Sequence, residues 1–437
     1  MEVVKVGLLG LGTVGSGAVE VLTRNDDEIS RRAGRNIRIT AAADRDISRA
    51  DFCKEKGIQF TDDAYEVVNN PEIDIIIELI GGYSPAKELV LKAIENGKHI
   101  VTANKALIAL HGNEIFGAAQ EKGVSVAFEA SVAGGIPIIK AVREGLSANK
   151  IQWVAGIING TGNFILTEMK DNKSDFADVL KEAQNLGYAE ADPTFDIEGI
   201  DAAHKLTILA SISYGIPLQF DKVFTEGITR ITSMDIEYAD ELGYNIKHLG
   251  ISKRTEKGIE LRVHPTLLPK KQMLANVNGV MNAVMVNGDA VGSTMYYGAG
   301  AGSEPTASAV VADIIDVARS LAVDSESKVP SLAFYPKKMS QVPALDIEQV
   351  ETGYYLRMEA LDKSGVMADI ARILSDQGVS IEALIQREPP SDNKFASIIM
   401  LTKKVSEKQM NDAIKAIESL DTINGKITRI RVEYLDC

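Results

Sequence analysis

Charged side chains that could do chemistry are concentrated in residues 187–205, a segment with five carboxylates, one histidine and one lysine. Asp201 and Lys205 are four residues apart, so a helix would place them on one face. Ile208 and Ile212 continue this stripe, which indicates that the face extends into a buried region. We therefore expect Asp201 and Lys205 to be partly shielded from water.

A shielded lysine that an aspartate keeps charged can donate a proton to an oxyanion as it forms. An exposed Asp–Lys pair would instead be an ordinary surface contact worth about 0.3–0.5 kcal/mol, and the residues alone leave both interpretations open. Reduction of a carbonyl by a nicotinamide cofactor needs a positive group at the developing alkoxide and groups that orient the substrate. Lys205 and Lys105 have the charge for the first task, and Glu190 and Asp196 could bind a substrate ammonium group.

A glycine-rich turn near the N-terminus has the spacing G-x-G-x-x-G and lies between an apolar, β-branched run at 3–10 and a helical stretch. The first glycine permits the tight turn, the second lets the backbone approach a pyrophosphate, and the third lets the helix pack on the strand. A glycine loop without a ligand is the alternative. The pattern predicts dinucleotide contacts from Gly10, Leu11, Gly12, Thr13, Val14 and Gly15.

Two further strand ends carry side chains that suit a dinucleotide. Asp44 could bind the ribose 2′-hydroxyl of NAD, whereas the neighbouring Arg45 suits the 2′-phosphate of NADP. Both are present, so dual use is possible, although an ordinary exposed turn would look the same. Lys105 follows another strand end, where the nicotinamide half would lie, but it is also compatible with a solvated surface lysine.

The elements that must position these residues follow an alternating order over residues 1–130. Apolar strand-like runs alternate with helical patterns, which predicts a Rossmann-type doubly wound parallel sheet, an α/β domain. The strands are expected at 3–10, 37–43, 73–79, 99–102 and 125–128, and helices at 85–96 and 114–122.

Residues 131–302 alternate less regularly and are interpreted as an α+β substrate-binding and dimerisation domain. Its helices are expected at 136–147, 176–186 and 199–214, and its strands at 154–158, 246–252 and 259–265. A good amphipathic helix at 305–322 is expected to return to the first domain, so that about 303–325 belongs there.

Residues 326–352 contain three prolines, at positions 330, 336 and 343, and are therefore predicted to be a linker. Residues 353–437 then show strands at 354–361, 379–386, 395–402 and 426–434, helices at 365–377 and 407–419, and a polar turn at 389–393. This order is βαββαβ, the ferredoxin-like arrangement. Such a unit has one open sheet face and exposed edges that invite pairing with a second copy.

The composition limits the classes of molecule that this protein is expected to bind. The formal net charge of −14 disfavours nucleic acid and membrane surfaces. No apolar run of membrane-spanning length and no leader pattern is present, so we expect a cytoplasmic, uncleaved protein. Cys53 and Cys437 have no metal-ligand spacing, and we expect neither zinc nor disulfides.

Five blocks of this sequence resemble the homoserine dehydrogenase family, in the family's order, over about residues 3–325. The tail from 354 resembles an ACT domain, an amino-acid-sensing module, with Leu361-Asp362-Lys-Ser-Gly365-Val366 matching its first strand-to-helix loop. The five blocks are GLGTVG at 10–15, TANKAL at 102–107, FEASVAGGIPII at 128–139, NGTGNFIL at 159–166 and GYAEADPTFDIEGIDAAHKL at 187–206.

The resemblance implies reduction of L-aspartate 4-semialdehyde to L-homoserine with NAD(P)H, on the route to threonine and methionine. It makes Lys205 the proton donor, Asp201 its orienting group, and Lys105 a contact of both nicotinamide and substrate. Glu190 and Asp196 would bind the substrate ammonium group. The resemblance adds four further contacts: Gly160, Thr161 and Tyr188 on the substrate wall, and Gly302 at the cofactor.

The resemblance also implies a structural site for a monovalent cation, which would be sodium. Glu129 would supply its side chain, and Val132, Gly134 and Ile136 their carbonyl oxygens. Without the resemblance, this stretch is a strand-to-helix turn stiffened by Pro137.

For the tail, the resemblance implies an L-threonine effector near Asp362, Gly365 and Val366, and a homodimer or homotetramer joined through ACT domains. The alternative is a dimerisation domain without a ligand. For the whole chain, two other functions remain open at this point. One is a catalytically silent sensor of a dinucleotide and an amino acid, and the other is an oxidoreductase on a different small amino-acid or keto-acid substrate.

Overall fold

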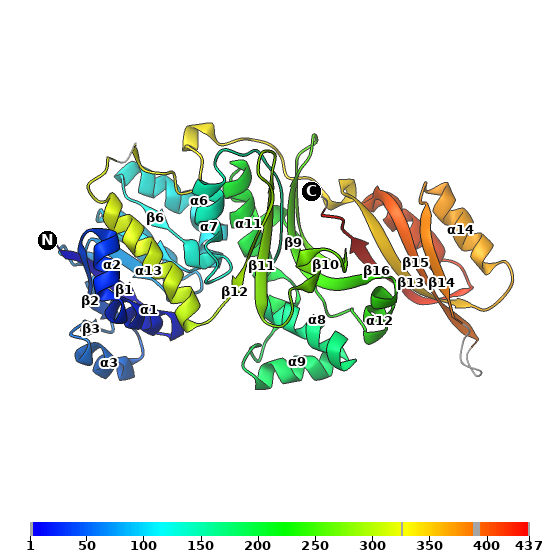
Figure 1. Ribbon diagram of the computed structural model, residues 1–437, viewed down its shortest axis with the longest axis horizontal. Helices are drawn as coiled ribbons and strands as arrows, with labels where there is room; N and C mark the ends of the chain where they lie inside the picture. Colours follow the sequence, from blue (N-terminus) through cyan, green and yellow to red (C-terminus); the bar gives the residue numbers. More distant parts are fainter. Residues whose placement is uncertain (1–2, 325–326, 388–393, 436–437) are drawn as a thin grey trace. The chain divides into compact units, whose positions relative to one another are not determined.

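The computed structural model describes residues 3–324, 327–387 and 394–435 (Figure 1). The turn predicted at 389–393 and Cys437 lie outside these ranges. The described residues form two units. The first is drawn from 1–158, 203–221 and 281–342, and the second from 159–202, 222–280 and 343–437.

The N-terminal apolar runs of the first unit form a six-stranded sheet in the order β3-β2-β1-β4-β5-β6, with parallel neighbours throughout. Strands β4 and β5 are buried along their whole length, which explains why their apolar residues are consecutive rather than alternating. The predicted Rossmann-type parallel sheet is confirmed. Its strands are β1 (Val3–Leu9), β2 (Asn36–Ala43), β3 (Gln59–Thr61), β4 (Ile75–Glu78), β5 (His99–Thr102) and β6 (Val126–Ala127).

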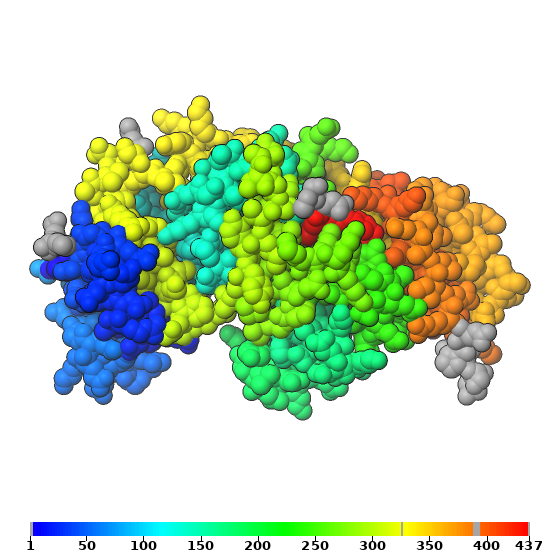
Figure 2. All heavy atoms as spheres, viewed as in Figure 1, coloured from blue at the N-terminus to red at the C-terminus, as the bar shows by residue number. Residues whose placement is uncertain are grey.

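Helices pack around this sheet, and α13 (Ser303–Ser320) returns to it from far along the chain, as predicted. It packs against α1, and Figure 2 shows the two, in yellow and blue, side by side at the surface. Gly17 permits this approach, since a Cβ there would lie 2.5 Å from Ser303 Oγ. The other helices are α1 (Thr13–Arg24), α2 (Asp26–Ala33), α3 (Ala50–Glu55), α4 (Ala64–Asn69), α5 (Ala86–Glu95) and α6 (Lys105–Lys122).

The first unit also holds an antiparallel group of strands, in the order β12-β11-β7. The helix predicted at 136–147 is shorter, because α7 covers three residues and continues as a π-helical turn. These elements are α7 (Ile138–Lys140), the π turn (Ala141–Gly145), β7 (Ile151–Ile157), β11 (Met281–Gly288) and β12 (Gly292–Ala299). Residues 203–214 of α11 (Ile200–Tyr214) belong to this unit.

The second unit joins the βαββαβ tail to part of the middle segment in one sheet, in the order β9-β10-β16-β13-β15-β14. The short strand β8 pairs with β10 outside this order. The elements from the middle segment are α8 (Gly160–Asn172), α9 (Phe176–Asn185), α10 (Thr194–Ile197), β8 (Phe224–Thr225), α12 (Ser233–Glu241), β9 (Tyr244–Arg254) and β10 (Ile259–Pro269).

The predicted βαββαβ order of the tail is confirmed. Its helices cover one face of the sheet around Tyr354, Leu356 and Met400. The elements are β13 (Glu351–Leu361), α14 (Val366–Asp376), β14 (Ile381–Gln386), β15 (Phe395–Ser406), α15 (Glu407–Glu418) and β16 (Ile423–Val432). Within the predicted linker, short 3₁₀ turns form at Pro336–Lys338 and Ile347–Gln349.

The expectation of an open sheet face in the tail is wrong. Tyr355 and Ile399 point away from α14 and α15 and pack into a second core with Ile236 and Tyr238 of α12. The sheet edge formed by β16 is not free either, because β16 pairs in parallel with β10. Within the described residues, only β14 remains an unpaired edge of the tail. No described helix is both long and apolar enough to span a bilayer.

Candidate active site

The three glycines of the N-terminal turn have three different surroundings. A Cβ on Gly10, whose φ is +96°, would lie 2.7 Å from the carbonyl oxygen of Leu79, and one on Gly15 would lie 2.0 Å from the carbonyl oxygen of Gly10. Gly12 has open space around its Cβ position. It precedes α1, whose first N–H groups receive no side-chain cap. The turn therefore leaves room and donors for a phosphate where the fingerprint predicts them.

Asp44 is fixed to this turn. Its carboxylate accepts hydrogen bonds from the N–H groups of Leu11 at 2.6 Å and Asp46 at 2.9 Å. Arg45 is exposed and makes no ion pair within the described residues. Asp44 thus lies beside the phosphate turn, and the guanidinium of Arg45 is available to an anionic group.

Gly302 lies at the same end of the first unit. It precedes α13 with φ +121°, and the next residue, Ser303, donates its hydroxyl to the carbonyl oxygen of Thr13 at 2.8 Å. This contact places the loop before α13 against the start of α1. The structure therefore brings Gly302 close to the glycine turn, as a cofactor contact requires.

Lys105 is the first residue of α6 and is half-buried. Asn104 caps this helix by accepting the N–H of Leu107 at 3.0 Å, and donates to the carbonyl oxygen of Gly82 at 2.8 Å. The loop after β4 and the loop after β5 are thereby tied together at the carboxyl edge of the sheet.

Glu78 supports the same pair of loops and was missed by the sequence reasoning. It is fully buried at the end of β4, and burial raises its pKa above the ordinary value. Its carboxylate accepts the hydroxyl of Thr102 at 2.7 Å and the N–H of Ile80 at 2.9 Å. An acidic residue that ends a wholly apolar strand is the signal that could have found it.

On α11, Asp201 and Lys205 are 2% and 8% exposed. The surface-pair interpretation is therefore excluded. Lys205 Nζ donates to the carbonyl oxygen of Ile158, directly after β7, at 2.7 Å. This bond aims the ammonium group at the end of that strand.

Asn159 connects three groups of the second unit and was also missed. Its Nδ2 donates to Asp201 Oδ2 at 2.9 Å and to Asp196 Oδ1 at 2.7 Å. Its Oδ1 accepts the N–H of Gly162 at 2.7 Å and so caps α8. One amide therefore holds two carboxylates and the start of α8, which begins at Gly160.

The remaining substrate residues lie around the same helix start. Thr161 donates its hydroxyl to the carbonyl oxygen of Tyr188 at 2.6 Å, which joins the 160–162 turn to the polar segment. Tyr188 also packs edge-on against Phe164. Glu190 is exposed and makes no hydrogen bond or ion pair with Asp196, so the structure does not bring these two carboxylates into contact.

Glu129 is buried, and its two carboxylate oxygens accept the N–H groups of Ile139 at 2.8 Å and Lys140 at 2.9 Å. Its own N–H donates to Asp313 at 2.7 Å. Burial raises the pKa of Glu129 above its ordinary value. A nearby positive charge would lower this cost.

The turn after Glu129 can supply further oxygens. Ala133 and Gly134 have φ of +54° and +49°, which folds the chain back sharply. The carbonyl oxygens of Val132 and Gly134 accept no hydrogen bond from the described residues, whereas that of Ile136 accepts the N–H of Ile138. One buried carboxylate with spare carbonyl oxygens beside it fits a hard cation.

The loop at residues 362–366, where an effector is predicted to bind, has the geometry of an anion-binding site. Gly365, with φ +98°, precedes α14, and no side chain caps that helix. Asp362 is exposed, while Val366 is buried in the core under the helix. The free helix N-terminus can accept a carboxylate, and Asp362 can accept an ammonium group.

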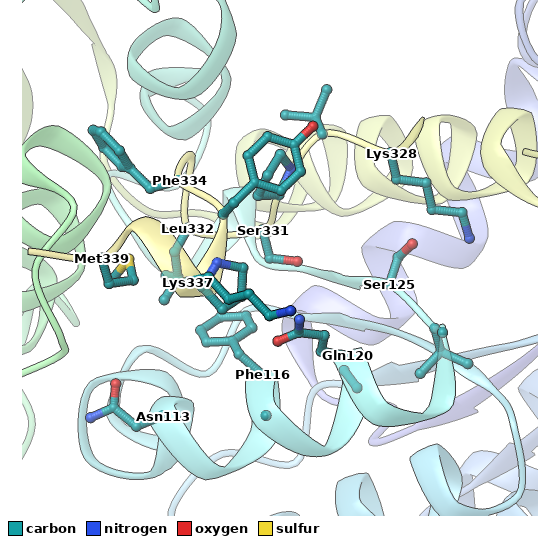
Figure 3. Close-up of a pocket in the computed structure, with 18 of the residues that line it drawn as sticks. Asn113, Phe116, Gln120, Ser125, Lys328, Ser331, Leu332, Phe334, Lys337 and Met339 are labelled. Atoms are coloured by element: carbon teal, nitrogen blue, oxygen red, sulfur yellow. The ribbon is translucent and has the colours of Figure 1, made fainter. Parts of the chain in front are cut away.

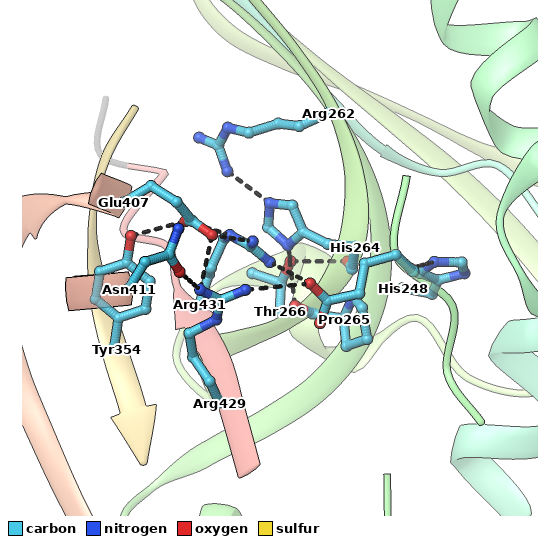
Figure 4. A network of polar contacts seen from close by, with 11 residues as sticks. His248, Arg262, His264, Pro265, Thr266, Tyr354, Glu407, Asn411, Arg429 and Arg431 are labelled. Carbon is cyan, nitrogen blue, oxygen red and sulfur yellow. Dashed lines mark hydrogen bonds and ion pairs between the residues drawn. The ribbon is translucent and has the colours of Figure 1, made fainter. Parts of the chain in front are cut away.

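A buried ionic network links the tail to β8 and β10 within the second unit (Figure 4). Arg431 on β16 is fully buried and contacts Glu407 at 2.5 Å and Glu226 at 3.0 Å. Burial alone would raise the pKa of Glu407, but the charge of Arg431 holds it below the ordinary value. The carbonyl oxygen of Glu226 in turn contacts His248 Nε2 at 3.0 Å.

The comparisons with known families agree with this geometry. A model described as homoserine dehydrogenase matches residues 137–315, and one described as its NAD-binding domain matches residues 10–129. An ACT domain model matches residues 354–422.

Curated relatives and solved structures match along the whole chain. Homoserine dehydrogenases of Pseudomonas aeruginosa and Bacillus subtilis are 62% and 39% identical, covering 100% and 99% of both chains. A crystal structure of the Thiobacillus denitrificans enzyme has a TM-score of 0.96 at 60% identity, covering 100% of this chain and 99% of that one. A hyperthermophilic archaeal homoserine dehydrogenase in complex with NADPH has a TM-score of 0.65 at 27% identity, covering 72% and 98%. The chain therefore belongs to the homoserine dehydrogenase family, whose members are NAD(P)-dependent oxidoreductases acting on a CH–OH group.

Proposed function

We propose that this chain reduces L-aspartate 4-semialdehyde to L-homoserine in threonine and methionine biosynthesis, with Lys205 as the proton donor. The observation that carries the proposal is the burial of Lys205 and Asp201 one turn apart on α11. A silent sensor would have no need of such a group, and family membership gives no support to that alternative. We retain the predicted domain limits, 1–130 with 303–325, 131–302 and 353–437, as part of the proposal.

The bound dinucleotide supplies the hydride. The residues that hold it are the glycine turn, Asp44 at the adenosine ribose, Arg45 at a 2′-phosphate and Gly302 beside the turn. Because Asp44 suits NAD and Arg45 suits NADP, we propose that both cofactors are accepted. Lys105 lies at the carboxyl edge of the sheet, where the nicotinamide half belongs, and contacts it there.

Lys205 places a positive charge and a proton where the aldehyde oxygen becomes an alkoxide. The carbonyl oxygen of Ile158 accepts one ammonium hydrogen, which fixes Lys205 Nζ at the end of β7 where the substrate oxygen would bind. A buried donor acts in a low dielectric, so its charge stabilises the forming alkoxide more than an exposed lysine would. Asp201, fixed by Asn159, places a carboxylate one helical turn from Lys205.

Asp196 and Glu190 bind the ammonium group of the substrate in this proposal. Asn159 fixes Asp196, whereas Glu190 is exposed and has to close onto the substrate as it binds. Gly160, Thr161 and Tyr188 form the rest of the substrate wall. The Thr161 hydroxyl joins its two parts, because it donates to the carbonyl oxygen of Tyr188.

We propose a sodium ion held by Glu129 and the carbonyls of Val132, Gly134 and Ile136. When bound, it supplies positive charge beside a buried carboxylate and fixes the turn between β6 and α7. We further propose that L-threonine binds the loop at Asp362, Gly365 and Val366 and inhibits turnover. The exposed edge of β14 supports homodimer or homotetramer assembly through the tail.

The decisive test replaces Lys205 with alanine. We expect kcat to fall by about 10²–10⁴-fold with a modest change in KM, because a proton donor acts mainly in the transition state. Steady-state rates of aldehyde reduction and homoserine oxidation measure it, with other hydroxy amino acids as competing substrates.

Lys98→Ala is the matched control, since Lys98 is also a buried lysine of the first unit whose Nζ donates to two main-chain carbonyls. Its kcat should stay near the wild-type value at a temperature where the variant is folded. Wild-type activity of Lys205→Ala would remove Lys205 from the mechanism. A better substrate than homoserine would overturn the proposed reaction.

A further inference from the structure

A cavity of about 720 Å³ lies in the first unit, away from every residue assigned above. It is formed by the C-terminal half of α6, the residues just before β6, Pro217 after α11, and the segment 328–339 (Figure 3). This volume is within the range of small-molecule sites, which is roughly 300–1,000 Å³.

The cavity lies at the opposite edge of the parallel sheet from the dinucleotide turn. Gly10–Gly15 and Lys105 follow the carboxyl ends of strands, whereas residues 123–125 of the cavity precede the amino end of β6. Dinucleotides bind at the carboxyl edge of such sheets. The cofactor therefore does not account for this cavity.

The segment 328–339 is held against the end of α11 by packing and by a hydrogen bond. Phe334 packs on Gly215, where a Cβ would lie 2.8 Å from its ring, and the N–H of Ser340 donates to the carbonyl oxygen of Gly215 at 2.5 Å. On the opposite wall, Asn113 of α6 both accepts from and donates to the main chain of Leu218. The walls of the cavity are thus fixed by hydrogen bonds and close packing.

The charged side chains that line the cavity are both positive. The lining contains Lys328 and Lys337 and no acidic residue among the described residues that form it. Neither lysine makes an ion pair with the described residues, and burial lowers the pKa of Lys328 below its ordinary value. In a chain with a net charge of −14, two ammonium groups at one cavity without an ion-pair partner among the described residues are an unusual local charge.

The rest of the lining is apolar with a few uncharged polar groups. Phe116 and Phe334 offer aromatic surface, while Gln120 and Ser125 offer hydrogen bonds. Figure 3 shows the Lys337 side chain directed towards Gln120 and that of Lys328 towards Ser125. Each ammonium group therefore points towards an uncharged polar side chain of the same cavity lining, and both can bind the acid group of a ligand.

We propose that this cavity binds a small organic anion with an aromatic or branched apolar body. The acid group lies between the ammonium groups of Lys328 and Lys337, and the apolar body lies against Phe116 and Phe334. The ligand would contact α6 at Phe116, about 16 Å along the helix from Lys105, so it occupies a site separate from substrate and cofactor.

The test uses the full chain, saturated with NADP⁺ to fill the dinucleotide site, and 8-anilinonaphthalene-1-sulfonate as a fluorescent probe. Gly117 lines the cavity on α6, and a Cβ there meets no atom within 4 Å. Gly117→Leu projects a branched side chain into the cavity and also favours the helix. We expect it to abolish one equivalent of bound probe. Gly145→Leu is the control, since Gly145 also has open space but lies outside the cavity.

A second pair of variants tests the charge. Lys328→Met combined with Lys337→Met should weaken probe binding at least tenfold, while Lys54→Met, an exposed lysine elsewhere in the unit, should leave it unchanged. The uncharged analogue N-phenyl-1-naphthylamine should bind the double variant within twofold of the wild type. Unchanged stoichiometry in Gly117→Leu would exclude the cavity as the site, and an unchanged Kd in the folded double variant would exclude an anion as its ligand.

Discussion

At the scale of single residues, Asn159 shows why the site could be predicted only in part. The helical spacing of Asp201 and Lys205 is local and can be seen in the sequence. The bonds from Asn159 to Asp196 and Asp201 join residues 37 and 42 positions apart, and no local pattern indicates them. Glu78 bonds to Thr102 over 24 positions for the same reason. Local spacing predicted that Asp201 and Lys205 are shielded from water, but the residues that hold this part of the chain in place depend on tertiary contacts.

Arg45 gives a prediction on cofactor choice. Arg45→Ala should lower kcat/KM for NADP more than for NAD, because only NADP carries the 2′-phosphate that the guanidinium can bind. Loss of one charge-assisted hydrogen bond costs about 1.5–3 kcal/mol, or roughly 10- to 150-fold. Steady-state kinetics with both cofactors measure the ratio, with exposed Arg49→Ala as the control. An unchanged ratio would place the phosphate contact elsewhere.

His248 gives a prediction on acid stability. Burial lowers its pKa to about 4, below the value of about 6.5 expected for an unfolded chain. The unfolded chain then binds more protons between these values, so the free energy of unfolding falls as pH drops from about 6.5 to 4. His248→Gln should reduce this slope by up to about 1.4 kcal/mol per pH unit. Urea unfolding at several pH values measures it, and equal slopes in both proteins would contradict the prediction.

At the scale of elements, strands buried on both faces were predicted well because their apolar runs are continuous. The β11–β12 hairpin was not predicted. Strand β12 is half-exposed along its length, so it has no clear apolar alternation. Helix α8 was also missed, because it opens with Gly-Thr-Gly-Asn, residues that favour helices poorly, and depends on the cap from Asn159.

Strand β16 and helix α15 carry two ion pairs that differ in burial, and this gives a prediction on stability. Glu407→Gln leaves the buried Arg431 without its main counter-charge and should cost about 3–5 kcal/mol of unfolding free energy. Lys426→Met breaks the Lys426–Glu418 pair, in which the lysine is 87% exposed, and should cost less than about 1 kcal/mol. Calorimetry of the full chain compares them. Similar costs for the two variants would mean that burial does not set the value of the pair.

At the scale of the whole molecule, the tail shares a core and a sheet with the middle segment, so its removal would expose Ile236 and Tyr238 of α12 and unpair β10. The regulatory role is therefore better tested by a surface change. Asp362→Asn should weaken inhibition by L-threonine at least tenfold while leaving kcat unchanged, because it removes the carboxylate that would bind the ligand ammonium group. Lys363→Ala, also exposed, is the control.

Inhibition is measured as rate against threonine concentration, with binding followed by calorimetry. If the full chain binds no threonine at millimolar concentration, or if Asp362→Asn responds as the wild type does, the effector assignment is wrong. Inhibition itself requires only a differential affinity of about 1–3 kcal/mol between active and inactive states.

The parallel pairing of β10 with β16 also has a consequence during synthesis on the ribosome. Thr266 and its partner Arg431 are separated by 165 positions. At roughly 5–20 residues per second, translation takes about 10–30 s to cover that distance. During that interval the edge of β10 that β16 will occupy has no partner in the nascent chain, and an unpaired edge attracts other strands. The nascent chain should therefore depend on chaperones most strongly after β10 has emerged from the ribosome and before β16 has.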